Sequence, residues 1–237
     1  MTMKLFHTAS SVFALAIFVS AAIASAAPEK ESPAALADMS GLAVDPNAAH
    51  PAVPIVESLH ASLVEIMKTA EELGYEGRTK ALEPVLEGSF DLEFMAKKSI
   101  GRSWKGLSEE EQTRWVETFK HFVVSNYARQ FDGYSGQYFE TVDVEPAPRE
   151  TVIVRTLLIR KNDDDVKLNY RLREMRRAPS DAGQGDPESE TRWRIIDVYS
   201  NGTVSELALR RSEFSALLSR HGFEGLIETV ESKSHKE

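Results

Sequence analysis

The sequence predicts an α+β fold in which a group of helices, four antiparallel strands and a second group of helices follow one another along the chain. Three successive patterns carry this prediction. Apolar residues recur at helical spacing from Pro54 to Phe131, they alternate with polar residues beyond Gly133, and helical spacing returns after Thr203. The composition, with 42% hydrophobic and 27% charged residues, is that of an ordinary globular protein.

The helical part, residues 54–132, begins with two predicted helices. The first runs from Pro54 to Leu73, because apolar residues fall on one face over this stretch and Gly74 can end it. The second covers residues 77–86, with its apolar side chains again at helical spacing.

Capping signals place the next two helices. Asp91 stands at the N-cap position of a short helix that ends at Gly101. Ser108 and Glu111, three residues apart, form a capping box. This box opens a long helix that runs to Phe131.

The sheet part, residues 136–199, is expected to contain four strands. They are predicted at residues 137–145, 151–160, 166–173 and 193–199. The second strand has apolar residues on both faces, which indicates a central strand covered on both sides. The segment 178–191, rich in Pro, Gly and acidic residues, is expected to be a mobile hairpin loop.

Residues 203–233 are predicted to form the C-terminal helices. Thr203 and Glu206 form a second capping box, and Gly222 breaks the helix that this box starts.

The N-terminal region is expected to be an export signal. A basic residue, a short apolar core and the small-residue end Ala24-Ser25-Ala26 predict a secretory signal peptide over residues 1–26. The alternative is an uncleaved membrane anchor, since the uncharged stretch is long enough to span a bilayer. Residues 27–53 follow as a flexible leader, and 54–233 as a single domain.

Composition excludes several classes of function. The chain has no Cys, which excludes a disulfide scaffold, a thiolate metal site, a cysteine nucleophile and a lipidated N-terminal Cys. The formal charge of −9 argues against a general nucleic-acid binder. The six His show no zinc-helix spacing, and neither a nucleophile elbow nor a phosphate loop is present. We therefore expect no catalytic residue, no metal and no cofactor.

Large apolar side chains gather near the predicted sheet. Several lie at the junction of the long helix and the first strand, among them Tyr127, Phe131, Tyr134 and Phe139. They fill a core, or they border an apolar pocket for a ligand. Periodicity leaves both interpretations open.

Several motifs, in order, resemble the MlaC (toluene-tolerance) family. They are Ser89–Ala96, Gly101-Arg102-x-Trp104, Asn169–Leu172, Trp193–Val198, Arg211–Phe214 and Gly222–Ile227. The resemblance covers roughly residues 54–230. It implies an NTF2/cystatin-like curved sheet packed with helices around an apolar cavity. It also implies an exported, soluble periplasmic carrier of lipid between the inner and outer membranes.

Two segments resemble one branch of that family more closely. Gln130–Gly136 and Asp197–Ser205 are similar to HpnM, the hopanoid-associated member. The resemblance implies a hopanoid or a phospholipid as cargo, an inner-membrane lipid transporter as partner, and transient contact with membranes. We expect a monomer that binds no nucleic acid. The long acidic segment 178–191 departs from the family's usual short hairpin.

Strand alternation and helical spacing then assign candidate site residues. The residues expected to line a lipid cavity are Tyr127, Phe131, Tyr134, Phe139, Val152, Val154, Leu158, Leu168, Tyr170, Leu172, Trp193 and Ile195. The opposite face of the third strand carries Lys167, Arg171 and Arg173, a candidate docking surface for a partner. Arg211 lies on the apolar face of its helix, so we expect it to form a structural ion pair with Asp197.

Two other classes of function remain open from the residues. An enzyme with an NTF2-like sheet would use Asp197, Tyr170 and Asp143 as acid and base. A structural periplasmic adaptor would have a filled core and no ligand.

Overall fold

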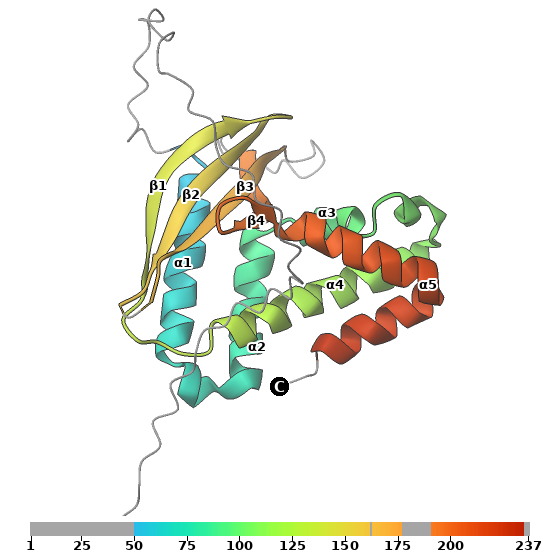
Figure 1. Ribbon diagram of the computed structural model, residues 1–237, viewed down its shortest axis with the longest axis horizontal. Coiled ribbons are helices and arrows are strands. Elements are labelled where there is room, and N and C mark those ends of the chain that lie inside the picture. The colour runs from blue at the N-terminus through green and yellow to red at the C-terminus, as the bar shows by residue number, and fades with distance from the viewer. Residues whose placement is uncertain (1–49, 162, 177–190, 235–237) are drawn as a thin grey trace, which may run out of the picture. The chain divides into compact units, whose positions relative to one another are not determined.

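The computed structural model describes residues 50–161, 163–176 and 191–234 (Figure 1). All described residues belong to one compact unit. The predicted signal peptide and most of the predicted leader and loop therefore lie outside the described residues.

The described residues contain the predicted groups of helices and the four predicted strands, with changed boundaries, and also a 3₁₀ helix and a fifth strand. The helices are α1 (Val53–Lys68), α2 (Ala70–Ser89), α3 (Leu92–Ser99), the 3₁₀ helix η1 (Gly101–Gly106), α4 (Glu109–Gln130) and α5 (Glu206–Ser234). The strands are β1 (Tyr138–Ala147), β2 (Thr151–Ile159), β3 (Val166–Arg176), β4 (Thr191–Ser200) and β5 (Val204–Ser205).

Both N-terminal capping predictions are confirmed. The Asp91 carboxylate accepts a hydrogen bond from the backbone N–H of Phe94 at 3.1 Å and caps α3. Ser108 and Glu111 form the reciprocal capping box of α4. The predicted break at Gly222 is also present, as a kink within α5 where this glycine has φ of +69°.

The boundary between the first two helices differs from the prediction. α1 ends at Lys68, and Thr69 separates it from α2, which continues through a kink at Gly74 as far as Ser89. The Thr69 hydroxyl donates to the Glu65 carbonyl and so competes with backbone N–H groups for the carbonyls of the last turn of α1. Apolar spacing continues across this boundary, so periodicity alone does not locate it.

The sheet has five strands, not four, in the order β1-β2-β3-β4-β5, and all neighbours are antiparallel. The additional strand β5 arises because Asn201 and Gly202 both take positive φ and reverse the chain. Thr203 lies in this turn, so the predicted Thr203 capping box is wrong. The N-cap of α5 is Ser205, whose hydroxyl accepts a hydrogen bond from the backbone N–H of Ala208.

The predicted inner face of the sheet is confirmed by the strand register. Val154 pairs with Tyr170, and Leu172 pairs with both Val152 and Ile195. Because directly opposite residues share a face, these side chains form one apolar surface. β2 is central, as predicted, but its second face is only half-buried at Ile153 and neighbouring positions.

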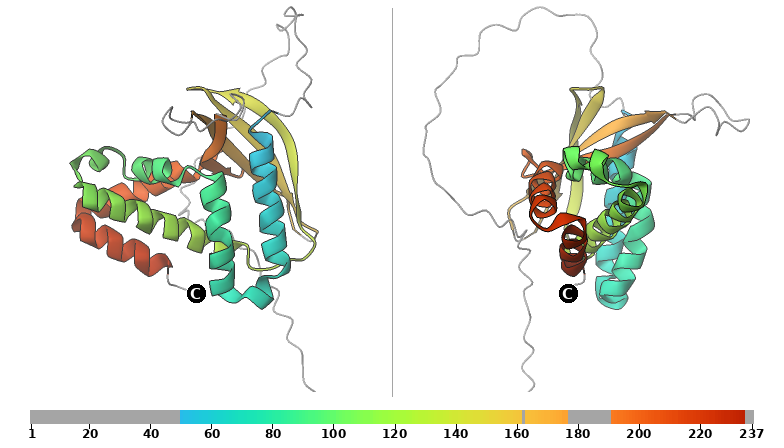
Figure 2. Two further views of the ribbon diagram at one scale, coloured as in Figure 1. Left: turned by 180° about the vertical axis from the view of Figure 1, so that it is seen from behind. Right: turned by 90° about the vertical axis from the view of Figure 1, so that its right-hand side faces the viewer.

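Helices cover this inner face. α1 contacts β1 and α2, α2 contacts α4, and α4 contacts α5 (Figures 1 and 2). Phe90, which follows α2, is tied to the sheet through an isolated parallel bridge to Ile195 of β4. The hydrophobic core therefore lies between the sheet and the helical group.

Candidate functional site

A chain of ring contacts runs through the interior between the sheet and the helices. Phe90, after α2, meets Tyr127 of α4 at 5.8 Å between centroids, and Tyr127 meets Phe131 at 5.4 Å. Phe131 meets Phe139 of β1 at 6.4 Å, and Phe139 stacks on His60 of α1 at 3.9 Å. Side chains from three helical segments and the sheet thus form one aromatic wall.

A buried polar pair lies at the sheet end of this wall. Nε2 of His60 and the Tyr170 hydroxyl are 3.1 Å apart. Burial lowers the pKa of His60 to about 3 and raises that of Tyr170, so both groups are neutral near pH 7. The neutral phenol and the neutral imidazole share a hydrogen bond, which gives each of these buried groups a partner in the apolar interior.

The sequence analysis did not single out His60. A usable signal was present, because His60 lies four residues after Val56 and three before Leu63, on the buried face of α1. A lone His on an apolar face gives no indication of its partner, since Tyr170 is 110 positions away.

The structure brings most of the predicted cavity-lining residues together. The eight on β2, β3 and β4 are buried or half-buried on the same sheet face as Phe139, and Tyr127 and Phe131 lie opposite them. Trp193 is half-buried and packs edge-on against His50 at 4.8 Å. Tyr134 does not join them: its side chain is 44% exposed, and the Lys68 ammonium lies over its ring.

The three cations of the predicted docking surface on β3 have different contacts. Arg173 forms an ion pair with the buried Asp91 and lies over the ring of Phe94. Arg171 donates to the hydroxyl of Thr151 and to a backbone carbonyl in the turn before β2. Lys167 is exposed. Two of the three cations therefore have partners within the fold, Arg173 at the start of α3 and Arg171 within the sheet and its β1–β2 turn.

The predicted ion pair between Asp197 and Arg211 is not formed. The Asp197 carboxylate accepts hydrogen bonds from the Ser205 hydroxyl and from the backbone N–H groups of Val198 and Leu207. Burial raises its pKa, which these hydrogen bonds partly offset. Arg211 is exposed, and its guanidinium lies against Gly101, at the start of η1, rather than against β4.

The three residues considered for acid–base chemistry lie in separate environments. Asp143 forms an ion pair with Arg155 on the outer side of the sheet. Tyr170 is paired with His60 in the interior, and Asp197 joins β4 to α5. General acid–base catalysis requires groups that converge on one reacting position, and these three do not.

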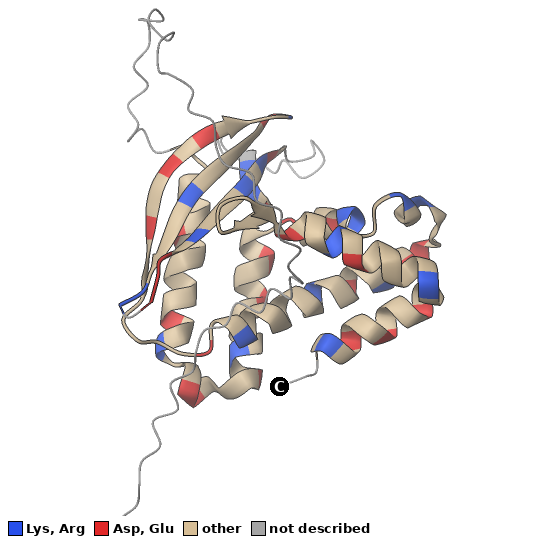
Figure 3. Cartoon of the chain, in the orientation of Figure 1, with Lys and Arg blue, Asp and Glu red and all other residues tan. Residues whose placement is uncertain are grey.

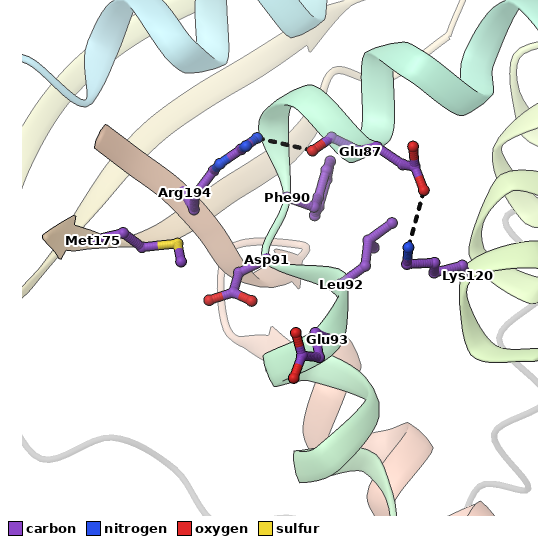
Figure 4. A pocket seen from close by; sticks show the side chains of 8 residues that line it. All are labelled: Glu87, Phe90, Asp91, Leu92, Glu93, Lys120, Met175 and Arg194. Atoms are coloured by element: carbon purple, nitrogen blue, oxygen red, sulfur yellow. Dashed lines mark hydrogen bonds and ion pairs between the residues drawn. The ribbon is translucent and has the colours of Figure 1, made fainter. Parts of the chain in front are cut away.

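A pocket of about 300 Å³ lies at the junction of α2 and α3, and the sequence did not predict it (Figure 4). Phe90, Leu92 and Met175 form its apolar part. Its charged groups have partners within the fold: Glu87 pairs with Lys120 at 3.1 Å, and Arg194 donates to the Glu87 carbonyl at 2.8 Å. These contacts tie the end of α2 to α4 and β4.

No group of three or more His, Asp or Glu side chains in the described residues could hold a metal ion. Within the same part of the chain, no helix is long and apolar enough to cross a membrane.

Comparison with known proteins identifies the family. A search of curated proteins gave no match. Among solved structures, a phospholipid-binding protein from Ralstonia solanacearum, in complex with a phospholipid, is similar in fold. Its TM-score is 0.63 at 17% sequence identity, over 78% of this chain and 97% of that one. The sequence model of the MlaC protein family matches residues 57–232, from the first turns of α1 almost to the end of α5. The chain belongs to the MlaC family.

Proposed function

We propose that this protein is a lipid carrier whose apolar interior, between the sheet and the helices, holds the hydrocarbon part of a membrane lipid. Membership of the MlaC family is the observation that carries the proposal. It is supported by the fold shared with a protein solved with a bound phospholipid, and by the aromatic wall from Phe90 to His60. The role is binding and transport rather than catalysis.

The energetics favour such a cargo. Each buried CH₂ group contributes about 0.8 kcal/mol, so a long hydrocarbon binds tightly with few polar contacts. The rings of the aromatic wall touch one another, and a lipid between them must separate the sheet from the helices. Contacts of each ring with lipid would replace the ring–ring contacts that are lost.

The site of action in this proposal is the periplasm. Residues 1–26 are the export signal, residues 27–53 are the leader that follows it, and residues 54–233 form the carrier domain. The carrier receives or delivers its lipid at an inner-membrane transporter, moves as a monomer, and connects the inner and outer membranes. Lys167 remains a candidate contact for that transporter, because it is exposed on the outer face of the sheet.

For the cargo we propose a hopanoid ahead of a diacyl phospholipid. Gln130–Gly136 and Asp197–Ser205 resemble the hopanoid-associated branch, and flat aromatic walls suit a rigid ring system that loses little entropy on binding. Apolar sites discriminate weakly among apolar ligands of similar size, so a direct competition is needed.

The competition uses donor vesicles that contain both lipid classes. The purified protein is incubated with them, separated by size and extracted for mass spectrometry. Enrichment of hopanoid over its share in the vesicles is the expected result. Uptake of phospholipid alone would remove the hopanoid assignment and leave the carrier standing, whereas uptake of neither would contradict the carrier itself.

A further inference from the structure

A basic and aromatic patch lies at the α3–η1 end of the described fold, outside the interior site. Its cations are Lys97, Lys98, Arg102, Lys105 and Arg211. Lys98, Arg102, Lys105 and Arg211 are exposed, and Figure 3 shows blue segments along α3 and the segment that follows it. The chain as a whole has a charge of −9, so this local excess of positive charge is opposite in sign to the whole protein.

Two partly exposed aromatic rings lie among these cations. The Lys97 ammonium is 5.5 Å from the centre of the Trp104 ring, and the Lys98 ammonium is 5.2 Å from that of Phe94. Both rings are half-buried, so each presents part of its surface to solvent. Rings at the headgroup level with lysines and arginines around them are typical of segments that lie on an anionic bilayer.

The patch is held rigidly. The buried Trp115 donates its indole N–H to the Ala96 carbonyl at 2.9 Å, which fixes α3 on α4. The Gln112 side chain donates to the carbonyls of Trp104 and Leu107, each at 3.2 Å, which fixes η1. The surface is therefore presented by packed elements and loses little entropy when it binds.

Arg211 joins the patch through a close approach to the backbone. Gly101 has φ of +60°, and a Cβ at this position would lie 2.8 Å from Nε of Arg211. The guanidinium of α5 thus lies against the turn that links α3 to η1. This approach adds a fifth cation from a distant part of the sequence to the four of residues 92–107.

The acidic residues nearby leave the patch positive. Glu93 is the one acid among residues 92–107, and it pairs with Lys97 at 2.5 Å. Glu109–Glu111 follow in the first turn of α4, where they complement the positive end of its helix dipole. By contrast, two of the three cations of the β3 surface are committed to contacts within the fold.

We propose that the α3–η1 basic patch docks this protein on a bilayer that contains anionic phospholipid. The cations approach the lipid phosphates, and Trp104 and Phe94 insert at the headgroup level. Repulsion of the acidic remainder of the protein orients the molecule with this end toward the membrane. The proposal deepens the lipid-carrier function, since a carrier must reach a bilayer, but its test measures membrane binding separately.

The test compares two variants with the same change in charge. In the first, Lys98→Gln, Arg102→Gln and Lys105→Gln remove exposed cations of the patch. In the second, Lys80→Gln, Lys161→Gln and Arg220→Gln remove exposed cations elsewhere. The proteins are purified in the form that accumulates in cells, so that all share the natural N-terminus. Thermal unfolding checks that both variants fold.

Binding is measured by sedimentation with vesicles of phosphatidylcholine alone or mixed with phosphatidylglycerol. We expect binding to the mixed vesicles only, weakened by salt. The patch variant should bind about fivefold more weakly for each neutralised residue, roughly hundredfold in all, while the control variant binds like the unaltered protein. Equal binding by the two variants would overturn the proposal, as would failure of the unaltered protein to bind the mixed vesicles. Lipid extracted from both variants reports on the carrier function itself, so the two failures are distinguishable.

Discussion

At the scale of single residues, His60 couples the stability of the interior to pH. Its pKa is lowered from 6.5 to about 3 by burial, so the unfolded chain binds a proton more readily than the folded one. The stability that this difference provides is fully present above pH 6.5 and is lost as the pH falls toward 3. Burial of His60 thus makes the folded interior more stable at neutral pH than at acidic pH.

Replacement of the imidazole tests this coupling. Between pH 6.5 and 5 the free energy of unfolding of the unaltered protein should fall by about 2 kcal/mol through His60 alone. His60→Gln should show a correspondingly smaller fall, whereas His221→Gln, at an exposed position, should behave like the unaltered protein. Urea unfolding across this range provides the measurement. Parallel curves for all three proteins would refute a buried, neutral His60.

Replacement of Arg173 should destabilise the fold more than replacement of Lys167, although both belong to the predicted docking surface. Arg173→Gln leaves the buried Asp91 without its charged partner and should destabilise the fold by about 2 kcal/mol. Lys167→Gln, at an exposed site, should change stability by less than about 0.5 kcal/mol. Denaturant midpoints of the two variants measure this difference, and equal midpoints would show that the Asp91 pair contributes nothing.

At the scale of elements, two residues compete as the N-cap of α5: Ser205, which the structure supports, and Thr203, which the sequence predicts. Ser205→Ala removes the hydroxyl that accepts from Ala208 and donates to Asp197, and should cost about 1 kcal/mol. Thr203→Ala should cost less than half of that, because Thr203 lies in the turn before β5. Thermal unfolding of both variants measures the difference. A larger loss of stability for Thr203→Ala than for Ser205→Ala would support the capping box expected from the sequence.

The same region shows what a sequence can and cannot predict here. The caps at Asp91 and Ser108 and the break at Gly222 were predictable from the sequence, because each depends on neighbours along the chain. Asn201-Gly202 is an equally local hairpin signal, but Thr203 and Glu206 offered a competing local interpretation. Strand alternation placed the inner face of the sheet correctly. The pairing of His60 with Tyr170 was beyond such reasoning, because it depends on how α1 packs on β3.

At the scale of the whole described fold, the proposed function requires the sheet and helices to separate. The Glu57 carboxylate and the Thr141 hydroxyl are 3.4 Å apart and join α1 to β1. Because the chain has no Cys, Glu57→Cys with Thr141→Cys can be joined uniquely by a short bis-maleimide. The linked protein should remain folded and take up lipid from vesicles much more slowly.

A matched link within the sheet provides the control. Asp143→Cys with Arg155→Cys joins two strands that are already paired and leaves α1 unrestrained. Uptake by this variant should match that of the unlinked protein. If the α1–β1 link slowed uptake no more than the strand link, separation of α1 from the sheet would not be part of loading.

The central claim, that this protein carries a membrane lipid in its interior, is tested most directly by its contents. The protein is purified without detergent, extracted with organic solvent and analysed by mass spectrometry against a known amount of protein. The account predicts a membrane lipid in an amount close to one molecule per chain. Protein that contains no lipid, and takes up none after incubation with vesicles, would contradict it.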